Sequence, residues 1–317
     1  NGGSISGQPT SYNVNTATFT LPAPTRAGYL FTGWTGTGLS SATKSVTVVK
    51  GSTGNRSYTA NWSLNTYTIS YILNGGSISG QKTSYDVTTE AFALPTPSRN
   101  GYTFTGWTGT GLSSATKSVT VAKGSTGNRS YTANWSANGY TVSFNYNKPT
   151  TDGTIGNTGT TNKAVTFNST YGTLPVPTLN GYTFAGWYTA ATNGTKVSDT
   201  TKYTTAGNST LYAHWNLNTY SIGYNLNGGS ISGQPTSYNV NTATFTLPAP
   251  TRAGYSFTGW TGSNGTTAQK RVSIAKNSTG NKSYTANWSL NSYYLDLNGT
   301  LDGASVSNIS GYGTADI

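Results

Sequence analysis

Side chains capable of acid–base, nucleophilic or metal chemistry are scarce in this sequence. The chain has no cysteine and a single histidine, His214. Its seven Asp and Glu residues are scattered along the chain: Asp86, Glu90, Asp152, Asp199, Asp296, Asp302 and Asp316. General acid–base catalysis needs an imidazole or a carboxylate at the reacting group, and calcium needs clustered oxygen ligands. The sequence therefore predicts no catalytic residue, no cofactor and no metal site.

The tryptophans show how the chain is organised. All eight fall into two series with the same spacing of 73, 80 and 73 residues, and each member of the second series follows its partner by 28 residues. The first series is Trp34, Trp107, Trp187 and Trp260, and the second is Trp62, Trp135, Trp215 and Trp288. A fixed period of this size predicts a tandem array.

The period divides the chain into four repeats and the start of another. Repeat 1 begins at an Asn-Gly-Gly turn and lacks the first strand of the others, and repeat 3 is longer and divergent. The predicted boundaries are repeat 1, 1–64; repeat 2, 65–137; repeat 3, 138–217; repeat 4, 218–290; and an incomplete unit, 291–317. Repeats 1 and 4 contain no Asp, Glu, His or Cys. An enzyme common to all repeats is therefore excluded if it uses a carboxylate or an imidazole, and we expect His214 to be a strand residue beside Trp215.

Alternating apolar residues in repeat 2 predict five short strands and no helix. The expected strands are Tyr67–Leu73, Ala91–Leu94, Tyr102–Phe104, Lys117–Lys123 and Tyr131–Trp135. Alternation places Tyr102 and Phe104 on one face, so Trp107 either faces the other side or follows a bulge at Gly106. The fold class is therefore mainly β, in small units.

One aromatic motif recurs in every repeat, as Gly-Tyr-x-Phe-x-Gly-Trp followed by the second tryptophan. Buried aromatic side chains would give such a small unit its core, whereas an exposed tryptophan would suit stacking on a carbohydrate. We assign these residues to the core. They are Tyr29, Phe31, Trp34, Trp62, Tyr102, Phe104, Trp107, Trp135, Tyr182, Phe184, Trp187, Trp215, Tyr255, Phe257, Trp260 and Trp288.

The net charge of +11 does not predict a nucleic-acid partner. Charged residues are only 8% of the chain, and the 18 Lys and Arg are spread over the array without forming a basic run. The excess arises because acids are few. No apolar run approaches the roughly 18 residues that a membrane-spanning helix needs, so no membrane span is expected in this segment.

Together, Leu-Pro-x-Pro, Gly-Tyr-x-Phe-x-Gly-Trp and the closing Tyr-x-Ala-x-Trp resemble the Listeria–Bacteroides repeat, also called the internalin B-repeat. The resemblance covers residues 1–290 and is closest in repeat 3, at Gly186-Trp187-Tyr188 and Leu211–Trp215. It implies β-grasp-like units strung in tandem on secreted or cell-surface bacterial proteins, acting as spacers or interaction modules. The short junctions, such as Ser63–Thr66, contain no Gly/Ser or Pro spacer and predict an elongated, semi-rigid rod.

Three functions follow as hypotheses. The first is a non-catalytic extracellular stalk or fibre segment whose partners are neighbouring repeats. The second is an adhesin that binds a host protein or glycan. The third is head-to-tail self-association, in which a strand formed by Tyr293, Leu295 and Leu297 completes repeat 1 of another subunit. The alternative to the third is that the sequence is a window of a longer array.

Overall fold

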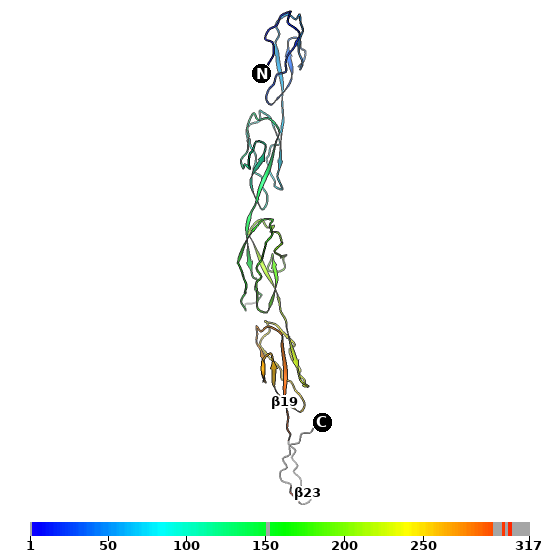
Figure 1. The fold of residues 1–317 in the computed structure, drawn as a ribbon, viewed down its shortest axis with the longest axis vertical. Helices are drawn as coiled ribbons and strands as arrows, with labels where there is room; N and C mark the ends of the chain where they lie inside the picture. Colours follow the sequence, from blue (N-terminus) through cyan, green and yellow to red (C-terminus); the bar gives the residue numbers. More distant parts are fainter. Residues whose placement is uncertain (1, 150–152, 294–299, 302–303, 306–317) are drawn as a thin grey trace. The chain divides into compact units, whose positions relative to one another are not determined.

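Strands and loops make up the described part of the chain. The computed structural model describes residues 2–149, 153–293, 300–301 and 304–305, and no helix occurs within these ranges (Figure 1). The prediction of a mainly β chain is confirmed. The described residues divide into two compact units. The first contains repeats 1 and 2 with residues 138–141, 164–170 and 202–208, and the second contains the remainder.

In the first unit, repeat 2 shows the complete topology. Its strands are β5 (Tyr67–Ile72), β6 (Ser84–Tyr85), β7 (Phe92–Ala93), β8 (Tyr102–Gly109), β9 (Thr120–Val121) and β10 (Arg129–Ala137). The main sheet has the order β6-β5-β10-β8, and β7 pairs with β9 separately. The first strand, β5, runs parallel to the last, β10, whereas β8 runs antiparallel to β10. The repeat is thus closed by pairing between its two ends.

A bulge in β8 brings two aromatic residues of the motif into the same core. The register passes from Gly106 opposite Asn134 to Phe104 opposite Trp135, so Thr105 is the extra residue. Phe104 and Trp107 are therefore both buried, with ring centroids 5.4 Å apart. The prediction that Trp107 follows a bulge is confirmed, and Trp107 has no solvent-exposed surface.

Repeat 1 contains the same architecture without its first strand. Its strands are β1 (Phe19–Thr20), β2 (Tyr29–Gly36), β3 (Thr47–Val48) and β4 (Tyr58–Leu64). They form two separate pairs, β2 with β4 and β1 with β3. No described residue takes the place that β5 has beside β10, so β4 is paired along one edge by β2 alone.

The second unit contains most of repeat 3 and all of repeat 4. Repeat 3 has β11 (Gly139–Asn145), β12 (Asn162–Thr166), β13 (Tyr182–Tyr188), β14 (Lys196–Val197) and β15 (Ser209–Leu217). Repeat 4 has β16 (Tyr220–Asn225), β17 (Ser237–Tyr238), β18 (Phe245–Thr246), β19 (Tyr255–Gly262), β20 (Gly265–Gln269), β21 (Ser273–Ile274) and β22 (Lys282–Leu290). Both repeat the parallel pairing of first and last strands. A short hairpin of β23 (Thr300–Leu301) and β24 (Ala304–Ser305) follows.

The observed strands differ in length from those expected in repeat 2. β8 and β10 extend beyond the predicted ranges because they pair with each other through the bulge, while β9 keeps only two residues of the predicted Lys117–Lys123. β6 was not expected. Its two residues, Ser84 and Tyr85, carry no alternating pattern and are fixed by pairing with Thr68 and Tyr67.

Replacing Gly106 with alanine should destabilise repeat 2. Gly106 has a φ of 143°, and a Cβ there would lie 2.7 Å from the backbone nitrogen of Thr116. Strain and overlap together should cost about 2–5 kcal/mol. Gly111→Ala is the matched control, because its φ of 76° is also strained but the space around it is open. Hydrogen exchange in β8 and β10 of the full chain should accelerate far more in the first variant. Equal acceleration in both would contradict this role of the bulge.

Candidate functional site: an open groove in repeat 1

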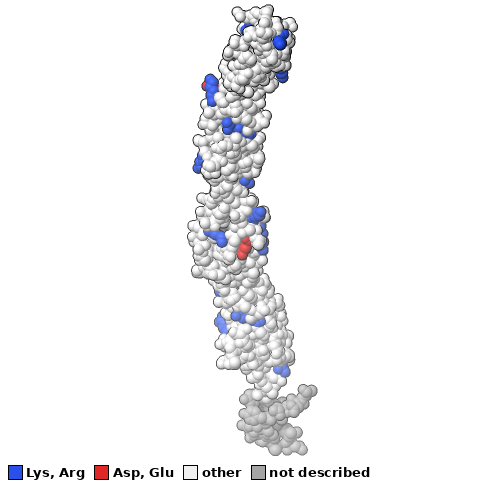
Figure 2. Space-filling view, turned by 45° about the horizontal axis from the view of Figure 1, so that its top comes forward, with Lys and Arg blue, Asp and Glu red and all other residues white. Residues whose placement is uncertain are grey.

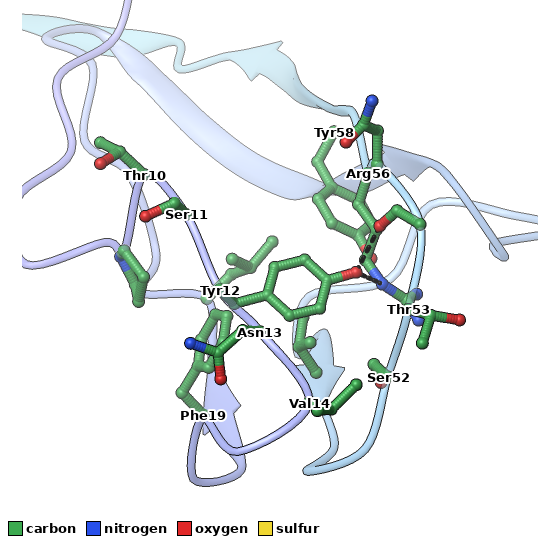
Figure 3. Close-up of a pocket in the computed structure, with 15 residues that line it drawn as sticks. Thr10, Ser11, Tyr12, Asn13, Val14, Phe19, Ser52, Thr53, Arg56 and Tyr58 are labelled. Atoms are coloured by element: carbon green, nitrogen blue, oxygen red, sulfur yellow. Dashed lines mark hydrogen bonds between the residues drawn. The ribbon is translucent and has the colours of Figure 1, made fainter.

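A cavity of about 630 Å³ lies in repeat 1, between the loop that precedes β1 and the loop that precedes β4. Figure 3 shows the ring of Tyr12 crossing it, with Phe19 below and Arg56 and Tyr58 on the opposite wall. Val48 of β3 also lines it. The groove therefore has apolar and aromatic walls with a polar cluster at one side. We call this cavity the repeat-1 groove.

The same place in repeat 2 is filled by β5. Tyr85, Arg129 and Tyr131 stand 73 residues after three residues of the groove, Tyr12, Arg56 and Tyr58. In repeat 2 these residues contact the first strand: β10 pairs with β5 along Arg129–Thr132, and the ring of Tyr85 lies 5.6 Å from that of Tyr67. The groove is thus the position of a first strand.

A hydrogen-bonded cluster holds the polar wall of the groove in place. The hydroxyl of Tyr12 donates to the carbonyl oxygen of Gly54 at 2.5 Å, and Nε of Arg56 donates to the hydroxyl oxygen of Tyr12 at 3.0 Å (Figure 3). Hydrogen bonds to Tyr58 and Tyr12 raise the pKa of the Arg56 guanidinium above its ordinary value. Arg56 therefore stays cationic and cannot serve as a proton donor or acceptor.

The groove offers binding surface but no reactive group. Its lining contains no Asp, Glu or His, so it holds no general base and no carboxylate ligand for a metal. Among the described residues, no three His, Cys, Asp or Glu side chains gather as a metal site would require. Sequence reasoning did not identify Tyr12 or Arg56, although their identity with Tyr85 and Arg129 at the repeat spacing was a signal that could have found them.

The phenylalanines and tryptophans of the motif form the same contact in each repeat. The first tryptophan is buried in all four, with between 0% and 7% of its surface exposed. The phenylalanine contacts both tryptophans edge to face, with centroid separations between 5.3 and 5.7 Å. These triads are Phe31–Trp34–Trp62, Phe104–Trp107–Trp135, Phe184–Trp187–Trp215 and Phe257–Trp260–Trp288. The second tryptophan is half-buried in every repeat.

The tyrosines of the motif lie at the rim rather than in the centre of the core. Tyr29, Tyr102, Tyr182 and Tyr255 are all half-buried. Three of them carry an arginine guanidinium on the ring face, at 3.7 or 3.8 Å from the centroid: Arg26 on Tyr29, Arg99 on Tyr102 and Arg252 on Tyr255. These contacts are cation–π interactions that need no carboxylate.

His214 is a partly buried strand residue next to Trp215. Its ring stacks on that of Tyr188 with centroids 3.9 Å apart, and Nε2 lies 3.0 Å from the carbonyl oxygen of Ala190. The described acids have equally local partners. Asp86 accepts hydrogen bonds from Thr88 and Thr89, which lower the pKa of its carboxyl, and Glu90 pairs with Lys123 at 2.6 Å.

In the first unit, the glycine of each Gly-Tyr pair packs against the repeat that follows. A Cβ on Gly28 would lie 2.1 Å from Cγ1 of Val87, and one on Gly101 would lie 2.5 Å from the ring of Phe167. Only glycine permits this approach. The carbonyl oxygen of Gly28 also accepts a hydrogen bond from the backbone nitrogen of Asn65 at 3.0 Å, which fixes the chain as it enters repeat 2.

The second unit has the same junction between repeats 3 and 4. A Cβ on Gly181 would lie 2.1 Å from Cγ1 of Val240, and the carbonyl oxygen of Gly181 accepts a hydrogen bond from Asn218 N at 2.9 Å. Val240 is only 3% exposed as a result. The equivalent glycine of repeat 4, Gly254, has no described residue within 4 Å of a Cβ placed on it. Gly254 is thus an internal control for Gly181.

The three residues expected to donate a strand are placed differently. Tyr293 lies in no strand and is 76% exposed, whereas Leu295 and Leu297 lie outside the described residues. The hypothesis of head-to-tail strand donation stays a prediction. Within the described ranges, no helix is long and apolar enough to cross a membrane.

The four repeats match two family models. The Listeria-Bacteroides repeat domain matches residues 67–134 and 140–214, and the Divergent InlB B-repeat domain matches residues 1–66 and 220–292. A protein of Evansella cellulosilytica whose name calls it a membrane protein is 35% identical over 208 residues, which are 63% of this chain and 28% of the relative. Internalin H of Listeria monocytogenes is 35% identical over 143 residues, 44% of this chain and 24% of the relative. The chain thus spans about a quarter of the length of these relatives.

Alkaline pH should weaken repeat 4 through Tyr224 of its first strand. Burial, and then the nearby Tyr284, raises the pKa of Tyr224 to about 12. Because the folded pKa lies above the unfolded one, this tyrosine's contribution to stability is complete below pH 10 and is lost as the pH rises through about 12. Tyr224→Phe should flatten the fall in stability of repeat 4 over that interval, measured by denaturant unfolding.

The exposed Tyr293 supplies the comparison for this titration. Tyr293→Phe should leave the pH dependence as it is in the parent chain, because 76% of that side chain is already in water. If both variants follow the parent curve between pH 10 and 12, burial of Tyr224 does not limit alkaline stability.

Proposed function

This chain belongs to the family of Listeria–Bacteroides and InlB B-type repeats, and from that premise we propose that it is a non-catalytic structural segment of a bacterial surface protein. The segment acts as a spacer, holding other parts of the same protein away from the cell. The names of the relatives, a membrane protein and an internalin, support an extracellular location.

The observation that carries this proposal is the repeated glycine junction. In each compact unit, the Gly-Tyr glycine of one repeat is covered by a side chain of the next, at Gly28, Gly101 and Gly181. One or two residues separate the last strand of a repeat from the first strand of its successor: Asn65–Thr66, Asn138 and Asn218–Thr219. A spacer needs such restricted joints, because a flexible linker would let its ends approach each other. These joints support the predicted semi-rigid rod.

An adhesive role gains less support. Lys and Arg are scattered over the face shown in Figure 2 and gather in no patch there that would suit a sulfated glycan. The groove is also too specific in shape for a general adhesive surface, since its walls are those of a strand position. Binding of a host protein or glycan therefore stays a prediction from the family resemblance.

Spin labels across the second-unit junction test the proposal. Because the chain has no cysteine, Thr192→Cys and Ala268→Cys, both at exposed positions, place one label in repeat 3 and one in repeat 4. We expect a single narrow distance distribution by pulsed electron paramagnetic resonance. Gly181→Ala should broaden it, because the added methyl displaces Val240.

Gly254→Ala is the control, since it has nearly the same φ, 77° against 75°, but an open surface. It should leave the distance distribution narrow. A broad distribution in the parent chain, or equal broadening by both substitutions, would show that the joints are flexible and would remove the basis for a spacer.

A further inference from the structure

The first strand has one register in the complete repeats. In repeat 2, Ile69 lies opposite Arg129 and Tyr71 opposite Tyr131. In repeat 4, Ile222 lies opposite Lys282 and Tyr224 opposite Tyr284. The strand is therefore held parallel to the last strand, with a buried isoleucine between two half-buried tyrosines. Ile69 and Ile222 are 4% and 5% exposed.

Three groups outside the sheet also hold this strand in repeat 2. The carbonyl oxygen of Thr83 accepts from Ile69 N at 2.8 Å, Oδ1 of Asn128 accepts from Thr68 N at 3.0 Å, and the carbonyl oxygen of Lys82 accepts from the Tyr71 hydroxyl at 3.0 Å. The residues 73 positions earlier are Thr10, Asn55 and Pro9, and all three line the repeat-1 groove. The same acceptors are thus available there.

A buried donor in repeat 1 points to the same ligand. In the three complete repeats, Nε1 of the second tryptophan donates to a carbonyl oxygen at the end of the first strand. These bonds are Trp135 to Leu73 at 3.0 Å, Trp215 to Tyr146 at 2.9 Å and Trp288 to Leu226 at 3.0 Å. Trp62 is the equivalent in repeat 1, and its Nε1 is buried with no acceptor among the described residues. Leaving a buried donor unpaired costs about 1–3 kcal/mol.

The groove is formed before any strand enters it. Ser4 and Thr25 exchange backbone hydrogen bonds of 2.8 Å, as Ser77 and Ser98 do in repeat 2 at 2.8 and 2.9 Å. Phe19 of β1 faces Val48 of β3, as Phe92 faces Val121. Only the residues that would touch the strand differ in exposure: Tyr12 and Tyr58 are half-buried, where Tyr85 and Tyr131 are 4% and 1% exposed.

We propose that the repeat-1 groove binds an extended peptide segment with the pattern Tyr-x-Ile-x-Tyr, added parallel to β4. The isoleucine would enter the cavity over Val48, and the segment's last carbonyl would accept the Trp62 indole N–H. The occupant is a first strand of this repeat type supplied by a separate segment, bound by strand addition. This goes beyond the spacer role and would hold whether or not the joints are stiff.

A synthetic peptide with the sequence of residues 65–74, Asn-Thr-Tyr-Thr-Ile-Ser-Tyr-Ile-Leu-Asn, provides the test. Isothermal titration of the full chain should show one saturable site. The same peptide with Asp in place of its isoleucine should bind roughly tenfold more weakly or worse, because the buried position cannot hold a charge. Trp62→Phe should weaken binding of the unchanged peptide about 3- to 10-fold by removing one hydrogen bond.

Two matched variants make the outcome decisive. Trp135→Phe, in a repeat that already holds its strand, should not change peptide affinity. Fusing the sequence of residues 65–73 in front of Asn1 should fill the groove and abolish binding. No binding at millimolar peptide, or undiminished binding to the fused chain, overturns the proposal. Self-association of the unfused chain that the fusion abolishes would also overturn it, assigning the groove to a second copy.

Discussion

Each complete repeat depends on the pairing of its first strand with its last. The pairing is parallel, so it joins segments separated by nearly the whole repeat: Ile69 lies opposite Arg129 and Ile222 opposite Lys282. The strand also supplies the isoleucine that completes the core and the carbonyl that accepts the second tryptophan's indole N–H. Burying one such isoleucine contributes about 1.5–3 kcal/mol, and each hydrogen bond about 0.5–1.5 kcal/mol. Repeat 1 keeps the remaining contacts and leaves this place open.

The recurrent Gly-Tyr-x-Phe-x-Gly-Trp motif has three mechanical roles. Its first glycine, as at Gly101, lets the next repeat pack against it. Its second glycine, as at Gly106, lets the strand bulge next to the backbone of Thr116. The bulge turns the phenylalanine and tryptophan to the same side, where they form the aromatic core. One short segment thus determines both the interior of a repeat and its joint to the next, which is why it recurs in an array built as a spacer.

Much of the fold was predictable because its signals are local. Alternation in Tyr67–Leu73 and the spacing of Phe104, Gly106 and Trp107 gave the strands and one of two alternatives for the bulge. The parallel pairing and β6 were not predictable, because they depend on partners far along the chain. The absence of a first strand in repeat 1 was evident from the period. That Tyr12, Arg56 and Trp62 enclose a preformed groove required the structure, since the same residues in repeat 2 are ordinary core and wall.

Hydrogen exchange of single backbone amides measures the difference between an open and a closed repeat most directly. β4 and β10 have the same residues at Tyr58–Ser63 and Tyr131–Ser136, so their intrinsic exchange rates match and only their pairing differs. The account predicts that the amides of Tyr58 to Ala60 exchange much faster than those of Tyr131 to Ala133, and that the two sets converge once the first strand is fused to repeat 1. Equal protection of both strands in the unfused chain would contradict it.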